Sequence, residues 1–345
     1  MRPVIPDSSD THERALEGHF VCGPGLLLSI ECLGHSYNTR TESHEMSVSL
    51  PTLKRDWQEG FLGPPAWTYR TSRDIKRDAE IEDANFEWGA TVGFHDEPDG
   101  TQAPDYARVR RWRFETTIAT TKFATDFANA RAKFVRELEA WWSLTSSWIS
   151  ICTEQDSVQV GKGGTGIRVG PIVIWCGDES SWRVNASVDT SRPVTDDRGV
   201  GILDHATLKG CMTLAANATK PPDEWVFIRD ARALIKAKQF RRAVIDAGTA
   251  AELAMTSLID PTLTEMNLLQ RERLFEKNRG LWELSNLMVE RNAGMRPDRL
   301  RQDLAEPRNK AAHDGAALNE TKANAAVAVA ADLVEQLHPL AELMP

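Results

Sequence analysis

The sequence predicts a multidomain α+β protein: a β-rich N-terminal region with a long amphipathic helix, followed by an all-α helical bundle. Three observations support this prediction. Short apolar runs separated by glycine and proline fill residues 1–118, aromatic residues then recur every three or four positions, and helical periodicity dominates after residue 220. Because 345 residues exceed the usual size of one hydrophobic core, we place domains at 1–118, 119–220 and 221–345.

The composition is that of an ordinary globular chain. Hydrophobic residues make up 41% and charged residues 26%, both typical of water-soluble proteins. The longest apolar runs fall far short of the ~20 residues that a membrane span needs. Residues 1–11 carry Asp7 and Asp10 and lack the apolar core of a signal peptide. We therefore expect a cytoplasmic protein without a membrane partner.

Cysteine usage and charge exclude further classes. The five cysteines are scattered and form no C-x-x-C pair, which predicts reduced thiols and neither a disulfide framework nor a zinc site. The net charge of −9 argues against a protein that coats duplex nucleic acid with a broad basic face. It is compatible with an enzyme that binds one or two phosphates. Most of the acidity precedes residue 221, since residues 221–345 carry a net charge of only −2.

Residues 1–118 predict a β-sandwich or barrel. Short strands at even spacing, separated by turn residues, are typical of these folds. Turns are expected at Gly23-Pro24-Gly25 and at Asp99-Gly100. The predicted strands cover residues 19–21, 26–33, 46–50, 86–94 and 107–118.

Residues 119–220 begin with a predicted amphipathic helix at 120–149. Its aromatic stripe favours core packing over a ligand platform. Strands are expected at 157–160, 167–176 and 182–188, and a helix at 203–216. The glycine-rich residues 161–166 resemble a phosphate loop, but they lead into a strand instead of the helix that such a loop requires. A hairpin loop is therefore the better interpretation.

The bundle is predicted to follow the boundary at Pro221-Pro222. Asp260-Pro261 should end its second helix, Thr264 should cap the third, and Pro297-Asp298 should open the segment that leads to the C-terminal motif. Several helices with short connections indicate a bundle. The expected helices cover residues 223–239, 240–258, 268–275, 281–291 and 321–343.

One stretch of the bundle combines side chains suited to phosphodiester chemistry, namely Arg308, Asn309 and His313. Arginine offers a permanently charged fork that matches phosphate, and histidine can exchange protons near neutral pH. In this hypothesis His313 takes a proton from an RNA 2′-hydroxyl or protonates the leaving 5′-oxygen, while Arg308 stabilises the transition state. Asn309 orients the phosphate or the imidazole. DNA lacks the attacking hydroxyl and would be spared.

The spacing raises an objection to this hypothesis. Side chains five residues apart on a straight α-helix diverge by about 140°. Pro307 is expected to kink the helix and Asp314-Gly315 to end it, which would let Arg308 and His313 converge. A dimer with this segment near its two-fold axis would also bring both groups to one cleft.

A purely structural interpretation is the alternative. A histidine in the last turn of a helix is favoured by the helix dipole alone. Arg308 would then pair with Glu306 or Asp303 on the surface.

Two features together resemble a known family. The form Arg308-Asn309-x-x-x-His313 is similar to the signature of the HEPN domain, Arg-x(4–6)-His, and the alanine-rich segment from Phe240 to Glu252 is similar to the second helix of that family, where a glutamate is common. The resemblance covers residues 221–345 and implies a metal-independent endoribonuclease that acts as a homodimer without cofactor or metal. It assigns catalysis to Arg308, Asn309 and His313, with Glu252 in support. A plain helix-surface glutamate is the alternative for Glu252.

The domain layout also resembles the ApeA-like branch of antiphage defence proteins. Together the resemblances imply an RNase effector that cleaves tRNA or mRNA in defence or as a toxin. Residues 1–220 would then sense a phage-derived trigger, bind an antitoxin, or inhibit the activity of the bundle. The alternative is a non-catalytic HEPN bundle for dimerisation or nucleotide binding. A third possibility is a small-molecule site in the N-terminal region, walled by Trp67, Trp88, Trp112 and Trp141.

Overall fold

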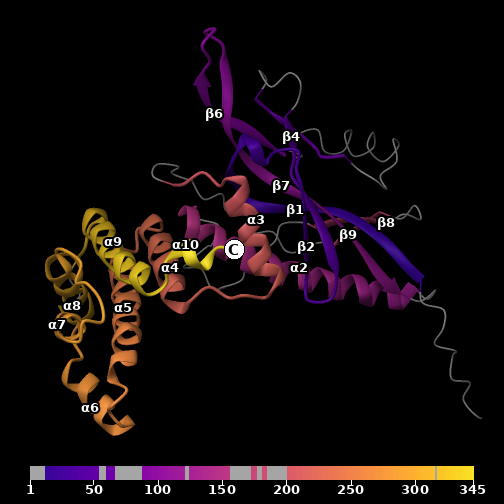
Figure 1. Ribbon diagram of the computed structural model, residues 1–345. Helices are drawn as coiled ribbons and strands as arrows, with labels where there is room; N and C mark the ends of the chain where they lie inside the picture. Colours follow the sequence, from indigo (N-terminus) through magenta and orange to yellow (C-terminus); the bar gives the residue numbers. More distant parts are fainter. Residues whose placement is uncertain are drawn as a thin grey trace, which may run out of the picture. The chain divides into compact units, whose positions relative to one another are not determined.

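A computed structural model of the chain describes residues 12–53, 60–66, 88–120, 124–155, 172–176, 181–184, 200–314 and 317–345 (Figure 1). The chain divides into two compact units. The first consists of Met1–Ile149 and Gly166–Thr219, and the second of Ser150–Thr165 and Lys220–Pro345. The first unit thus combines the two regions that the sequence separates near residue 118.

The first unit is built on one seven-stranded antiparallel sheet. Its centre is formed by two long strands, β1 (His12–Ser29) and β7 (Gln102–Thr120), which pair from His12↔Thr120 to Ser29↔Tyr106. The strand order is β2-β3-β7-β1-β8-β9, and β6 pairs with β7 as well. The other strands are β2 (Ser36–Arg40), β3 (Glu45–Ser49), β6 (Gly89–Asp96), β8 (Ile172–Cys176) and β9 (Ser181–Val184), while β4 (Thr52–Leu53) and β5 (Leu62–Gly63) form a separate pair.

The strands are longer than the sequence predicts. Gly23-Pro24-Gly25, expected as a turn, lies within β1, where the register with β7 shifts between Val21 and Leu26. Such a bulge absorbs extra residues without ending the strand. Gly25 has a φ of +95°, and a Cβ there would lie 2.8 Å from Cγ of Arg108. Strand β2 was not predicted from the sequence.

Helix α2 (Ala124–Thr153) covers the sheet with its aromatic stripe. Trp142 lies 5.1 Å from Phe20 and 5.0 Å from Trp112, and Phe134 lies 5.4 Å from Phe114, measured between ring centroids. The core-packing interpretation of the stripe is confirmed. Among the described residues a helix thus packs where the predicted sandwich would have a second sheet. The helix begins later than expected because β7 continues to Thr120.

The predicted tryptophan-walled site does not form among the described residues. Trp88, Trp112 and Trp141 are at most 5% exposed and belong to the core. The indole N–H of Trp141 donates to Thr39 Oγ1 at 3.1 Å. Trp67 lies outside the described residues, as do residues 156–171 with the glycine-rich loop. Helix α3 (His205–Ala216) completes the unit, capped by Asp204, whose carboxylate accepts from Thr207 N at 2.7 Å.

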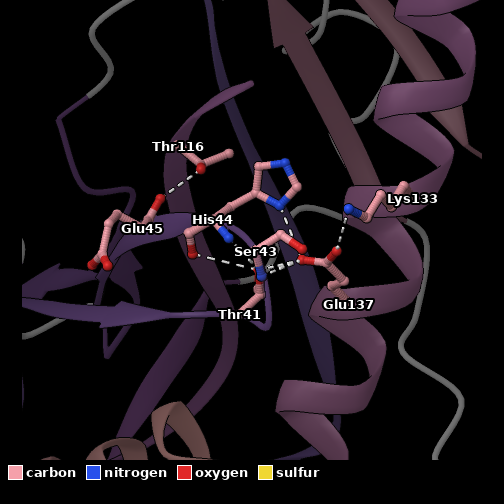
Figure 2. A network of polar contacts seen from close by, with 7 residues as sticks. All are labelled: Thr41, Ser43, His44, Glu45, Thr116, Lys133 and Glu137. Atoms are coloured by element: carbon pink, nitrogen blue, oxygen red, sulfur yellow. Dashed lines mark hydrogen bonds and ion pairs between the residues drawn. The ribbon is translucent and has the colours of Figure 1, made fainter. Parts of the chain in front are cut away.

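A buried carboxylate ties the β2–β3 turn to α2 (Figure 2). Glu137 Oε2 accepts hydrogen bonds from Thr41 Oγ1 at 2.7 Å, Ser43 N at 3.0 Å and His44 Nδ1 at 2.9 Å. Lys133 Nζ lies 3.6 Å from the other carboxylate oxygen. Burial acts to raise the pKa of Glu137, but the hydrogen bonds from Thr41, His44 and Ser43 outweigh it and lower that pKa to about 2. The carboxylate is therefore ionised throughout the physiological range.

Replacing Glu137 by Gln should lower the free energy of unfolding by about 2 kcal/mol at neutral pH, because hydrogen bonds to a buried charge are lost. The folded pKa is depressed from its ordinary 4.5 to about 2, so the stabilisation is complete above the ordinary pKa and is lost as pH falls through the folded one. Urea unfolding from pH 7 to pH 2 measures this, with Glu139→Gln on the same helix as the control. A constant difference between wild type and Glu137→Gln across the range would contradict the assignment.

The second unit is helical, in agreement with the predicted α+β class. Helix α5 (Phe240–Ile259) packs against α4, α7 and α9. Its buried surface is made largely of alanine, which lets neighbouring helices approach closely. The other α-helices are α4 (Asp223–Lys236), α6 (Leu268–Lys277), α7 (Leu281–Glu290), α8 (Glu306–Asn309), α9 (Glu320–Leu337) and α10 (Leu340–Leu343).

The predicted end of α5 is correct, whereas the predicted cap of α6 is wrong. Helix α5 ends at Ile259 and passes into a 3₁₀ turn at Asp260–Leu263, as Asp260-Pro261 predicts. The cap of α6 is Asn267 instead of Thr264: Asn267 Oδ1 accepts from Gln270 N, and Gln270 Oε1 accepts from Asn267 N, both at 3.0 Å. Thr264 has helical dihedral angles, whereas a cap residue must be extended.

Candidate functional site

The Arg308–His313 motif lies in a helical run that changes its winding twice. Leu300–Ala305 (η4) is π-helical, Glu306–Asn309 (α8) is α-helical, and Lys310–Asp314 (η5) is π-helical again. The run starts at Leu300, after Arg299 in the left-handed region (φ 62°), and not at Pro297-Asp298 as predicted. Short π-helical turns are rare and occur frequently at functional sites.

Pro307 accounts for part of this winding. Proline donates no hydrogen bond and its ring crowds the carbonyl four residues earlier. In the turn before it, Glu306 N–H bonds to the Arg301 carbonyl, five residues back. A π-helical turn contains more residues than an α-helical turn, because its hydrogen bonds join residues five apart. The angle between side chains five residues apart, such as Arg308 and His313, is therefore smaller than on a regular α-helix. The run ends at Asp314, where the sequence predicts an end.

Arg308 packs directly on α5. A Cβ built on Gly248 would lie 2.6 Å from Cγ of Arg308, so this side chain occupies the space that any larger residue would fill. Its guanidinium lies 3.6 Å from Glu252 Oε2 (Nη2 to oxygen), and its Nη1 lies 3.5 Å from Asn309 Oδ1. The structure therefore brings Arg308, Asn309 and Glu252 together. The Arg308 side chain is 30% exposed, which leaves the guanidinium accessible to a ligand.

Arg308 does not form the ion pair with Glu306 or Asp303 that the alternative, purely structural interpretation would give it. Asp303 pairs with Arg299 at 3.1 Å, and Glu306 pairs with Arg301 at 3.2 Å. Arg308 pairs instead with Glu252 of helix α5. Glu252 is 44% exposed on the surface of α5 and forms an ion pair with the Arg308 guanidinium.

His313 lies in the last turn of the run and is exposed. Its ring makes no hydrogen bond or ion pair with any residue that the structure describes, Arg308, Asn309 and Glu252 included. Asn309 is exposed as well. Within one copy of the chain, the structure thus positions the arginine firmly and leaves the imidazole open to solvent.

Arg241 anchors the turn that bears His313. Its Nε donates to the carbonyl of Ala311 at 2.7 Å, and Ala311 itself is fully buried. A cation near the last carbonyls of a helix is also favourable to the helix dipole. Neither Arg241 nor Gly248 was predicted from the sequence as part of the site. Their spacing could have indicated this. Arg241, Gly248 and Glu252 occupy positions i, i+7 and i+11, which lie on one side of a helix.

No cluster of three or more His, Cys, Asp or Glu side chains arranged to hold a metal ion occurs in the described ranges. The helices within those ranges also include none with the length and apolar character to cross a membrane.

Comparisons with known proteins give no match. No protein-family model matches the chain, and neither a curated protein nor a solved structure is significantly similar to it.

Gly248 provides a direct test of how Arg308 is packed. Exchanging glycine for alanine inside a helix ordinarily stabilises by about 1 kcal/mol. Here the new methyl group would overlap Cγ of Arg308, so Gly248→Ala should give no such gain. The same exchange in an Arg308→Ala background should recover it, because the three atoms nearest to the new methyl group all belong to Arg308 and only Cβ, at 3.5 Å, remains in that variant. Urea unfolding of wild type, the two single variants and the double variant measures both steps. Equal stabilisation in the two backgrounds would contradict the packing.

Proposed function

We propose that this chain is a metal-independent endoribonuclease effector of the HEPN type, whose site is formed by Arg308, Asn309 and His313 with support from Glu252. The observation that supports this most is the Arg308 guanidinium, held on α5 by Gly248 and Glu252 yet partly exposed. A fixed, accessible cation and a solvent-open imidazole on the same helical run are the minimal groups for phosphodiester transesterification.

Each residue has a separate task in the proposed reaction. His313 accepts the proton of the RNA 2′-hydroxyl as the 2′-oxygen attacks phosphorus, or donates a proton to the departing 5′-oxygen. The new bond closes a 2′,3′-cyclic phosphate while the bond to the 5′-oxygen breaks. Arg308 stabilises the additional negative charge on the phosphoryl oxygens. Asn309 donates from its amide to the phosphate, and Glu252 holds Arg308 in place.

A homodimer through the bundle is part of the proposal. His313 makes no contact with Arg308 through a hydrogen bond or ion pair in one chain, whereas two copies of the same exposed run facing each other would supply both groups to one phosphate. Two-fold association uses the same surface on both partners.

The remaining roles concern the first unit. It forms a compact unit of its own, which suits a part that senses a trigger or restrains the nuclease. The proposed setting is the cytoplasm, in antiphage defence or a toxin system, with tRNA or mRNA as substrate and a phage-derived trigger or an antitoxin as partner.

Purified protein incubated with tRNA or mRNA in excess EDTA should produce fragments with cyclic-phosphate ends. His313→Ala should reduce the cleavage rate by about 10²–10⁴-fold, the range for loss of a general acid or base. Arg308→Ala should reduce it by about 10²–10³-fold, as for loss of an oxyanion-stabilising group. Gel analysis of end-labelled RNA measures both rates.

His338→Ala is the matched control, since His338 lies in the same unit but pairs with Glu224 at 3.6 Å. Its cleavage rate should equal that of wild type. If RNA from briefly induced cells and purified samples alike show no cleavage that depends on His313, the nuclease proposal is wrong. A cellular phenotype that survives Arg308→Ala and His313→Ala would favour a non-catalytic bundle.

Mixing two inactive variants tests the composite site. If each site takes its arginine from one protomer and its histidine from the other, Arg308→Ala and His313→Ala chains that exchange freely should recover about a quarter of wild-type activity, since half of the dimers are mixed and each has one intact site. Cleavage by the refolded or slowly exchanged mixture is the measurement. No recovery despite proven mixing would show that both groups act within one chain.

A further inference from the structure

A second cationic feature lies where α7 meets the start of the helical run that bears Arg308. The Trp282 ring of α7 is contacted by two guanidinium groups: the carbon of Arg296 lies 4.4 Å and that of Arg301 lies 5.5 Å from the ring centroid. Arg296 also donates to Asn286 Oδ1, one turn along α7, at 2.6 Å. We call Trp282, Arg296 and Arg301 the arginine–tryptophan cluster.

The cluster is connected to the candidate site through the run itself. Arg301 and Arg308 are seven residues apart on it, which corresponds to roughly 10 Å of helical rise. Arg301 Nε bonds to Glu306 Oε1 at 3.2 Å, and Glu306 is two residues before Arg308. A strand of RNA with one phosphate at Arg308 would therefore have its neighbouring nucleotides within reach of Arg301.

This part of the chain carries a small excess of positive charge. Residues 296–310 contain five Arg and Lys side chains against three carboxylates, in a protein whose net charge is −9. A local excess of cations favours contact with a polyanion.

The two arginines differ in how they are held. Arg296 donates a hydrogen bond to Asn286 and stacks closely on the Trp282 ring. These two contacts attach the segment after α7 to that helix. The Arg301 side chain is 63% exposed, and its ion-pair partner Glu306 is 51% exposed. Exposed ion pairs of this kind contribute little to stability, so Arg301 can exchange its glutamate for a phosphate readily.

We propose that the arginine–tryptophan cluster binds single-stranded RNA beside the candidate site, with a base stacked on the Trp282–guanidinium layer and a phosphate on Arg301. Guanidinium planes and indole rings both stack on bases, and the planar fork of arginine also matches phosphate. This inference rests on the proposed function for its substrate class. It adds where the strand lies and which groups hold it.

The test uses the full chain carrying His313→Ala, so that RNA is bound without being cut. Fluorescence anisotropy with a short labelled single-stranded RNA gives the Kd. Adding Arg301→Gln should weaken binding about tenfold, because the phosphate loses its guanidinium partner and the stacking layer loses one of its two guanidinium groups. The slope of log Kd against log salt concentration should fall by about one, the value for one lost phosphate contact. Arg279→Gln is the matched control, since Arg279 is equally a cation of this unit, 75% exposed and paired with Glu276 at 3.2 Å.

Further variants distinguish the contribution of stacking to RNA affinity from that of charge, and from a loss of affinity caused by misfolding. Arg301→Lys keeps the charge but loses the planar fork and should recover only part of the affinity. Trp282→Phe keeps a ring and should bind more tightly than Trp282→Leu, with circular dichroism confirming that each variant folds. Duplex RNA should bind less tightly than the single strand, because its bases are not available for stacking.

Equal losses for Arg301→Gln and Arg279→Gln would overturn the inference, because net charge alone would then explain binding. So would unchanged binding in Arg301→Gln while wild type still cleaves RNA. RNA binding that depends on Arg301 and Trp282, without any cleavage by wild type, would support the cluster and refute the nuclease assignment instead.

Discussion

The close approach of the Leu300–Asp314 run to α5 is the constraint on which the second unit's candidate site depends. It is possible because residue 248 has no side chain, so that the aliphatic part of Arg308 lies against the helix backbone and its guanidinium reaches Glu252. Near the other end of the run, Arg241 binds the carbonyl of Ala311. The backbone is therefore held on both sides of Asn309, while the side chains that face solvent remain free to meet a ligand.

The winding of the run follows from the same contacts. A regular α-helix would conflict with Pro307 and would turn positions 308 and 313 far apart. The π-helical turns on either side accommodate the proline and keep Ala311 buried, Arg308 on α5 and His313 exposed. Irregular winding has an energetic cost, and here it coincides with the residues to which we assign chemistry.

The first unit uses its ionisable and aromatic groups differently. Glu137 is buried, ionised and already bonded to the β2–β3 turn, and His44 is held by that carboxylate and by the edge of Phe134, 5.5 Å away between ring centroids. A carboxylate committed in this way stabilises the fold and is poorly suited to exchanging protons with a substrate. The tryptophans likewise close the core between α2 and the sheet. These groups of the first unit are therefore buried and structural, whereas Arg308 of the second unit is partly exposed and Asn309 and His313 are exposed.

Local sequence determined much of this protein by itself: the α+β class, the aromatic face of α2, the end of α5 at Asp260-Pro261, and the helical location of Arg308, Asn309 and His313. These follow from periodicity and from the backbone limits of proline and glycine, which act over a few residues. Only the tertiary structure decided that Gly23-Pro24-Gly25 lies within a strand, that Arg308 pairs with Glu252 instead of Asp303 or Glu306, that Arg241 binds the carbonyl of Ala311, and that Trp282 contacts Arg296 and Arg301. The reason is physical: strand register, ion-pair choice and π-helical winding depend on groups brought together from distant parts of the chain, and their energies differ too little locally for sequence to select among them.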